Sequence, residues 1–264
     1  MQYRCQMKVP VISGLFSIIE GFGSYAIFFA EIVRWVFKKP FDTKNLVLQM
    51  LEIGYKSLPV TGITIFFTGM VMALQIGRAM EAQMPGSSIY IGSAVTIAMF
   101  RELSPVLTAL LLAGRVGSAI AAEIGTMKVT EQIDALTTLS ANPIQYLAVP
   151  RFLSCLIMAP ALTILTDIIG ASGGAFIGFT ALGISVNKYI QNIIQYTTAM
   201  DFLSGIIKSV FFGIEIAVIS CYEGFKTQGG AEGVGKSTIT AVVKSSMVIL
   251  ISDYFFTYLL QYLG

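Results

Sequence analysis

Five apolar runs, each long enough to form a membrane-spanning helix, constrain the fold of this chain more than any other feature. They cover about Pro59–Met80, Ile89–Ala121, Phe152–Leu182, Phe202–Tyr222 and Ile239–Leu263. A helix of about 20 apolar residues crosses the roughly 30 Å hydrocarbon core of a bilayer. A soluble domain carries about 25% charged residues, whereas this chain of 264 residues has 12%. The sequence therefore predicts an all-α integral membrane protein with five spans, of which the second and third tilt or extend beyond the bilayer.

Two segments before the first run are predicted to lie at the membrane surface. Residues 10–39 are apolar but are interrupted by three charged residues and closed by Trp35 and two lysines. This pattern favours an interfacial helix, with a true span as the alternative. Residues 43–57 are amphipathic and look like a second surface helix that leads into the membrane. The predicted organisation is an N-terminal region, 1–57, followed by a five-span region, 58–264.

The distribution of lysine and arginine predicts the orientation of the chain. With five spans, twelve of these residues fall on one side of the membrane and three on the other. The twelve are Arg4, Lys8, Arg34, Lys38, Lys39, Lys44, Lys56, Lys128, Arg151, Lys226, Lys236 and Lys244, and the three are Arg78, Lys188 and Lys208. Because basic loops are retained in the cytoplasm, we expect a cytoplasmic N-terminus and a periplasmic C-terminus.

The second run carries charges at positions where an isolated helix would expose them to lipid. Arg101 and Glu102 are adjacent, so their side chains point about 100° apart and do not simply pair with each other. Pro105 follows them, and Arg115 lies nearer to the predicted cytoplasmic end, where it is expected to snorkel. Intramembrane charges are costly and usually functional. A polar lining that meets a lipid headgroup is therefore favoured for Arg101 and Glu102 over a purely structural ion-pair network.

Three further acids, Asp167, Glu215 and Asp253, lie within predicted spans. Such a set is typical of proton-coupled transporters. Its spread over three helices is equally typical of polar contacts between helices, so both interpretations stay open at this point.

A polar segment at 122–143 follows the second run. Thr130 is a favourable N-cap, and Glu131 and Gln132 would occupy the first helical turn, where acidic groups interact well with the helix dipole. Asn142, followed by proline, is predicted to end this helix. The result is a short cytoplasmic helix, either an ordinary loop helix or a coupling helix that docks on an ATPase subunit.

The third run carries small residues at helical spacing, Gly170, Gly174 and Gly178. In a membrane such residues let helix backbones approach closely. We expect close packing within the subunit or, alternatively, a dimer seam. The amphipathic stretch at 186–197 is predicted to lie on the outer surface.

Residues 230–237, GAEGVGKS, match the P-loop pattern letter for letter. A P-loop holds phosphates between a buried strand and a helix, but here an apolar helix precedes the motif and a span follows it. Nucleotide binding is therefore rejected, and the glycines are predicted to form a flexible cytoplasmic turn. The chain has no histidine, which excludes a His-based metal site. The three cysteines, Cys5, Cys155 and Cys221, lie far apart and are predicted to be small core residues rather than a disulfide or metal framework. No basic block suggests a nucleic-acid partner.

Four stretches of the sequence carry a resemblance to a known family. They are FRELSPVLTALLLAGRVGSAIAAEIGTMKVTEQIDAL at 100–136, NP at 142–143, PR at 150–151 and GGAEGVG at 229–235. It is similar to the MlaE-type permeases of the MCE-system phospholipid ABC transporter family, from about residue 45 to the C-terminus. The resemblance implies a homodimer bound to two cytosolic ATPase subunits. It also implies an MCE-domain lipid carrier on the outer face and, in some systems, a small STAS-domain protein. The implied cargo is a phospholipid.

The resemblance also implies roles for particular residues. The lipid-cavity residues would be Arg101, Glu102, Met72, Ala79 and Met80. The ATPase-coupling residues would be Glu123, Glu131, Gln132 and Asp134.

We therefore expect a non-enzymatic transport subunit without a cofactor, which moves phospholipids between the inner membrane and the cell envelope. A bacterial inner membrane and a plastid inner envelope both fit. One alternative is a proton-coupled secondary transporter that uses the intramembrane carboxylates. Another is a scaffold that only anchors the ATPase and the MCE partner.

Overall fold

The computed structural model describes residues 10–38, 43–83 and 90–263, and every regular element in these ranges is a helix. The elements are α1 (Pro10–Val36), α2 (Thr43–Met50), η1 (Leu51–Tyr55), α3 (Leu58–Gln83), α4 (Ile91–Ala98), η3 (Met99–Leu103), α5 (Ser104–Leu112), η4 (Ala113–Gly117), α6 (Ser118–Val129), α7 (Gln132–Thr138), η5 (Ile144–Ala148), α8 (Val149–Thr180), α9 (Val186–Tyr196), α10 (Ala199–Phe225) and α11 (Gly230–Leu263). The η elements are π-helical segments. Arg4, Cys5, Lys8 and Lys39 lie outside the described residues.

Five segments of the described chain are long and apolar enough to cross a membrane, which confirms the predicted fold class. They are Thr43–Gln83, Ile91–Val129, Ile144–Thr180, Ala199–Phe225 and Gly230–Tyr262. The second and third contain 39 and 37 residues. At 1.5 Å per residue they measure about 55–60 Å, well beyond the hydrocarbon core. The amphipathic segment predicted at 43–57 runs directly into the first span.

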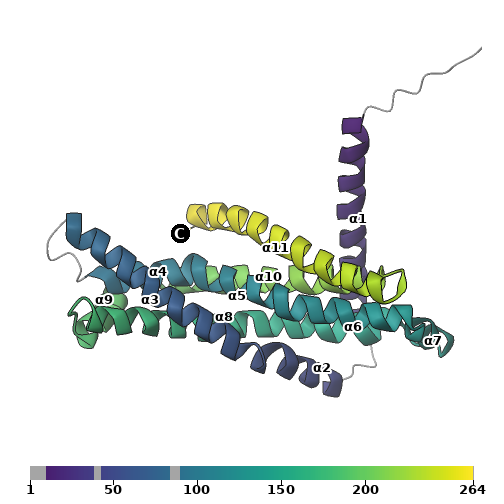
Figure 1. Ribbon diagram of the computed structural model, residues 1–264, viewed down its shortest axis with the longest axis horizontal. Coiled ribbons are helices and arrows are strands. Elements are labelled where there is room, and N and C mark those ends of the chain that lie inside the picture. Colours follow the sequence, from purple (N-terminus) through teal and green to yellow (C-terminus); the bar gives the residue numbers. More distant parts are fainter. Residues whose placement is uncertain (1–9, 39–42, 84–89, 264) are drawn as a thin grey trace, which may run out of the picture.

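The long helices lie side by side, with α8 in contact with α3, α4, α5 and α10 (Figure 1). Glycines bring α3 and α8 together. A Cβ added at Gly173 would meet the carbonyl oxygen of Phe66, and one added at Gly69 would meet the carbonyl of Gly170. Gly174 and Gly178 face Tyr189 of α9. The glycine face of α8 therefore packs within the chain.

The N-terminal helix α1 runs across the direction of the spans (Figure 1). Its Tyr25 hydroxyl donates to the buried Glu223 of α10, while Lys244 of α11 pairs with the same carboxylate at 2.8 Å. Burial, together with Glu223, raises the pKa of Tyr25 to about 12, so the hydroxyl stays a donor at physiological pH. At the end of α1, Lys38 lies 4.3 Å from the centre of the Trp35 ring. These contacts attach α1 to the spans, and its interfacial position stays a prediction.

The second span consists of three α-helical pieces joined by two π-helical segments. Arg101 and Glu102 lie in η3, and Arg115 lies in η4. Single π-helical turns inside α-helices are frequent at functional sites. Arg115 was expected to snorkel, but its Nη1 donates to Ser57 Oγ at 2.6 Å and so joins η4 to the residues after η1.

Two predicted helix boundaries around α7 are wrong. Thr130 ends α6 instead of capping α7, because its hydroxyl donates backwards to the Thr126 carbonyl. Glu131 takes the N-cap position with a left-handed backbone, φ 60°. Asn142 does not end α7, which stops at Thr138. The Asn142 Oδ1 instead accepts the backbone N–H of Ile144 at 2.9 Å and so caps the next helical segment.

The P-loop-like run is also not the flexible turn that was predicted. Only Gly229 and Gly230 adopt positive φ, at 89° and 70°, and these residues form the turn between α10 and α11. Residues 231–237 form the first two turns of α11. A run that is already helical within itself does not form the phosphate-wrapping loop of a P-loop. Cys155 and Cys221 are buried, as predicted.

The close approach of α3 and α8 leads to a test by glycine substitution. Gly173→Ala places a methyl group against the Phe66 carbonyl, so we expect the free energy of unfolding to fall by about 1–3 kcal/mol. Gly235→Ala is the matched control, because nothing lies within 4 Å of its added Cβ. We expect that variant to be neutral or more stable by about 0.5–1 kcal/mol, since alanine favours helix over glycine. Steric trapping in bicelles measures both, and equal stability of the two variants would contradict the packing described.

Candidate functional site

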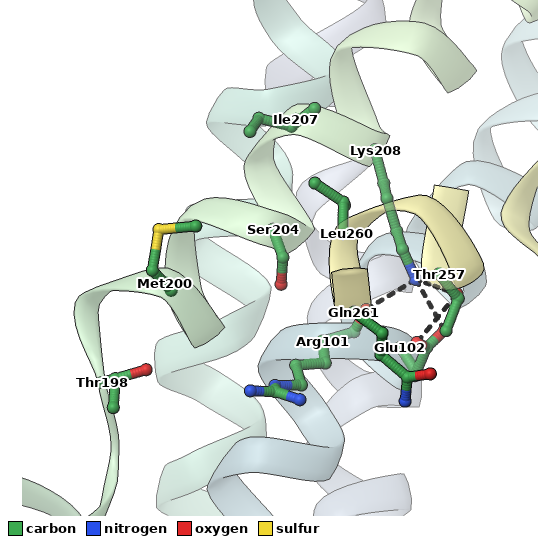
Figure 2. A pocket seen from close by; sticks show the side chains of 10 residues that line it. All are labelled: Arg101, Glu102, Thr198, Met200, Ser204, Ile207, Lys208, Thr257, Leu260 and Gln261. Atoms are coloured by element: carbon green, nitrogen blue, oxygen red, sulfur yellow. Dashed lines mark hydrogen bonds and ion pairs between the residues drawn. The ribbon is translucent and has the colours of Figure 1, made fainter. Parts of the chain in front are cut away.

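A cavity of about 320 Å³, with charged and apolar lining residues, lies between η3, α10 and α11. Its lining residues are Arg101, Glu102, Thr198, Met200, Ser204, Ile207, Lys208, Thr257, Leu260 and Gln261 (Figure 2). The structure therefore brings the charged pair of the second span together with two later spans that sequence reasoning had not connected to it.

Lys208 of α10 is the central cation of this site. Its side chain is 2% exposed, and its Nζ lies 2.8 Å from Glu102 Oε2 and 3.0 Å from Asp253 Oδ1. Nζ also donates to Thr257 Oγ1 at 2.7 Å, and Thr257 in turn donates to Glu102 Oε1 at 3.0 Å. Figure 2 shows the contacts of Lys208 with Glu102 and Thr257 converging on the ammonium. The ammonium thus joins η3, α10 and α11 through two carboxylates and one hydroxyl, which we call the Lys208 network.

Two local features position Lys208 against η3. In a regular α-helix the Arg101 carbonyl would accept the N–H of residue 105, but that residue is proline and has no N–H. Lys208 Nζ donates to this carbonyl instead, at 3.0 Å. One turn earlier in α10, Gly205 packs directly on the Phe100 carbonyl, where any side chain would clash. Pro105 leaves the Arg101 carbonyl free as an acceptor, and Gly205 lets α10 approach closely enough for Lys208 to reach that carbonyl.

Arg101 has a separate partner. Its Nε forms an ion pair with Asp201, which is buried at the start of α10. The Asp201 carboxylate also accepts the backbone N–H of Thr198 at 2.7 Å, as part of a capping box. The side chain of Arg101 is 47% exposed, and in Figure 2 its guanidinium points away from the Lys208 network. It therefore presents donors to the cavity while Asp201 holds it in place.

The chemistry of the cavity suits an amphiphile. Arg101 offers a planar donor group that matches phosphate or carboxylate oxygens. The side chains of Met200, Ile207 and Leu260 line the same space with apolar surface. The ammonium of Lys208 is fully engaged by its own partners, so its role is to hold the helices and carboxylates in place.

The sequence did not lead us to assign Lys208 or Asp201 to this site. Lys208 was instead counted among the basic residues on the outer side of the membrane. Lys208 lies inside α10, so that count becomes twelve against two, and the predicted orientation is unchanged. A lysine within an apolar run was the available signal.

Of the three intramembrane acids whose role was left open, Asp253 pairs with Lys208 and Glu215 accepts a hydrogen bond from Ser252 at 3.1 Å. Asp167 is buried and forms no ion pair within the described chain, and Ser104 lies beside its carboxyl group.

The structure does not bring Met72, Ala79 and Met80 to this cavity. Met72 packs against the cluster around Val95 and Met99, and Met80 packs against the cluster around Ile91. Ala79 is exposed on α3. A role for these three residues along a lipid path stays a prediction.

The predicted coupling residues divide into two groups. Glu123 pairs with the buried Arg151 at 2.8 Å, and Asp134 pairs with Lys128 at 3.1 Å, so both hold the local fold. Glu131 and Gln132 are exposed at the start of α7. Below them Ile133 is buried against the aromatic side chains at the ends of α1 and α10. The helix α7 is therefore anchored by Ile133, with Leu136 packed against the same core cluster, and presents a short polar surface.

Comparison with known proteins identifies relatives along almost the whole chain. Residues 46–259 match the family model described as Permease MlaE. A probable ABC transporter permease protein of Rickettsia typhi is 43% identical over 91% of this chain and 92% of its own length. One from a Synechocystis species is 43% identical over 83% of this chain and 82% of its own length. The Arabidopsis thaliana protein named TRIGALACTOSYLDIACYLGLYCEROL 1, chloroplastic, is 40% identical over 94% of this chain and 66% of its own length.

The Lys208 network leads to a charge-balance test. Lys208→Met leaves two carboxylates without a cation in a buried site, so we expect the free energy of unfolding to fall by about 3 kcal/mol. Adding Glu102→Gln and Asp253→Asn removes the unpaired charges, and most of the lost stability should return. Steric trapping of the single and triple variants measures both effects. A triple variant as unstable as the single variant would show that Lys208 acts through packing alone.

Proposed function

Since this chain belongs to the MlaE permease family, we propose that it moves phospholipids between the inner membrane and the cell envelope. It is an ABC transporter permease and a multi-pass membrane protein, so ATP is hydrolysed by a partner subunit. The observation that carries the proposal is the cavity, in which the half-exposed Arg101 guanidinium lies beside apolar side chains. Membership of an ABC permease family favours this function over a proton-coupled secondary transporter.

The cavity supplies what a lipid needs in order to leave the bilayer. Each buried CH₂ contributes about 0.8 kcal/mol to membrane anchoring, so a two-chain lipid does not leave unaided. We assign Arg101 to the headgroup phosphate, because its guanidinium faces the cavity and its orientation is held by Asp201. The apolar lining residues would accompany the upper parts of the acyl chains.

We assign α7 to coupling with the ATPase. Glu131 and Gln132 are exposed, and neither forms an ion pair within the described chain. The left-handed backbone of Glu131 is strained for a residue with a side chain, and such strain concentrates at functional sites. Because Glu123 and Asp134 are engaged within the subunit, we place the contact on the first two residues of the helix. The second span extends to the end of α6, about 40 Å from Arg101 at 1.5 Å per residue, and a short turn then leads into α7, so the span connects the two sites.

We propose further that the functional unit is a homodimer with two ATPase subunits and an MCE-domain lipid carrier on the outer face, with a STAS-domain protein as a further partner. The N-terminus would be cytoplasmic and the C-terminus periplasmic. A plastid inner envelope is the alternative location, which the relative named chloroplastic supports.

The headgroup assignment is tested by transfer of a fluorescent phospholipid in liposomes that contain the complete transporter. Arg101→Ala combined with Asp201→Asn removes the guanidinium without leaving a buried charge unpaired. Loss of a charge-assisted hydrogen bond of about 1.5–3 kcal/mol should slow transfer by about 10- to 100-fold. Arg78→Ala is the matched control, because Arg78 is exposed on α3 and does not line the cavity. Unchanged transfer in the double variant would refute the assignment.

The coupling assignment is tested by ATP hydrolysis in the same reconstituted complex. Glu131→Lys reverses a charge at the proposed contact, so lipid-stimulated hydrolysis should fall by about tenfold, equivalent to about 1.4 kcal/mol. Glu232→Lys makes the same change on the exposed first turn of α11 and should have no effect. Normal coupling in Glu131→Lys, or equal losses in both variants, would rule out a specific role for α7.

A further inference from the structure

A cluster of buried polar side chains lies between α5 and α8, apart from the Lys208 network. Its members are Ser104, Thr108, Thr166 and Asp167, each at most 1% exposed. The spacing of four residues on α5 and the adjacent positions on α8 place them on facing surfaces. Thr108 Oγ1 and Thr166 Oγ1 lie 3.0 Å apart and share a hydrogen bond between the helices. We call this cluster the α5–α8 polar seam.

The hydrogen bonding of the seam is incomplete. Both carboxyl oxygens of Asp167 are buried, and the one side-chain donor beside them among the described residues is the Ser104 hydroxyl, which has no other partner. Buried polar atoms are almost always satisfied, and a carboxyl group that has at most one donor beside it and no cation points to a further ligand on its oxygens. An isolated carboxylate in a membrane interior is especially unfavourable.

The charged groups on neighbouring elements are already engaged. Arg101 pairs with Asp201, and Lys208 lies between Glu102 and Asp253. Glu215 accepts from Ser252. No lysine or arginine among the described residues forms an ion pair with Asp167, so the compensating charge must come from outside the chain.

We propose that the α5–α8 polar seam binds one monovalent cation, Na⁺ or a proton, on the Asp167 carboxyl. The donor set consists only of oxygens, two from the carboxyl group and three from hydroxyls, which suits a hard cation. A single carboxylate balances a single positive charge, whereas divalent sites such as those for Ca²⁺ usually gather more carboxylates. Na⁺ would be held by the carboxyl and hydroxyl oxygens together. A proton would make Asp167 a donor to Ser104.

The position of the seam gives the cation a structural consequence. Ser104 follows directly after η3, the segment that carries Arg101 and Glu102. An ion bound between α5 and α8 would fix the α5 end of the cavity wall against the central helix of the bundle. The occupancy of the seam would therefore affect the stability of the fold around the cavity without any contact to the transported molecule.

The test is the melting temperature of the full-length chain in phosphatidylcholine nanodiscs, compared in NaCl and in choline chloride at equal ionic strength. If Na⁺ is the ligand, the wild-type melting temperature should rise by about 3–5 °C when Na⁺ reaches about ten times its Kd. If a proton is the ligand, the melting temperature should fall as pH rises, irrespective of Na⁺, because the bound form is lost as pH rises. Either response supports the seam as a cation site and identifies the ion.

Asp167→Asn keeps the shape of the side chain and removes its charge, so it should abolish whichever response the wild type shows. Glu215→Gln is the matched control, since Glu215 is also an acid within a span but has its own hydrogen-bond partner. That variant should respond like the wild type. Isothermal titration of wild type with NaCl provides a second measurement should Asp167→Asn fail to fold. A wild type that shows neither saturable Na⁺ binding nor a pH response, or an Asp167→Asn variant with the full wild-type response, would overturn the proposal.

Discussion

A buried ammonium held by two carboxylates is the interaction on which the cavity depends. Lys208 would be strongly unfavourable alone in an apolar bundle, and Glu102 and Asp253 would each lose their cation without it. Because the three groups come from η3, α10 and α11, their ion pairs fix the relative positions of three spans. Pro105 and Gly205 make this possible, the first by freeing a backbone carbonyl and the second by allowing the helices to touch. The wall of the cavity is therefore set by electrostatics as much as by apolar packing.

The membrane fold could be predicted from the sequence because it depends on run length, which is a local property. The presence of the charged residues Arg101 and Glu102 inside an apolar run could be seen for the same reason. Their partners could not, since Lys208 is separated from Glu102 by 106 positions and only the packing of the spans brings them together. Local signals also failed at Thr130 and Asn142, where each side chain had two backbone groups within reach and the sequence did not decide between them. The glycine-rich run from Gly230 is helical because it forms the start of α11. This helix begins before the apolar residues from which the fifth span was predicted.

The two ends of the second span have different physical characters. At one end the charged residues form ion pairs within the chain and border a cavity with apolar walls. At the other end α7 is held by Ile133 and Leu136 and begins at a strained residue, and its polar surface is open to a partner. The π-helical segments η3 and η4 carry Arg101, Glu102 and Arg115. The helices from η3 to α6, followed by a short turn into α7, connect the cavity to this polar surface.

The account as a whole depends on a phospholipid occupying the cavity beside Arg101. A cryo-EM structure of the complete transporter in lipid nanodiscs measures this directly. We predict density for a phosphate group within about 3 Å of the Arg101 guanidinium, the distance of a charge-assisted hydrogen bond, with acyl chains along Met200, Ile207 and Leu260. A lipid bound elsewhere in the complex, with the Arg101 cavity collapsed or filled by protein side chains, would contradict it.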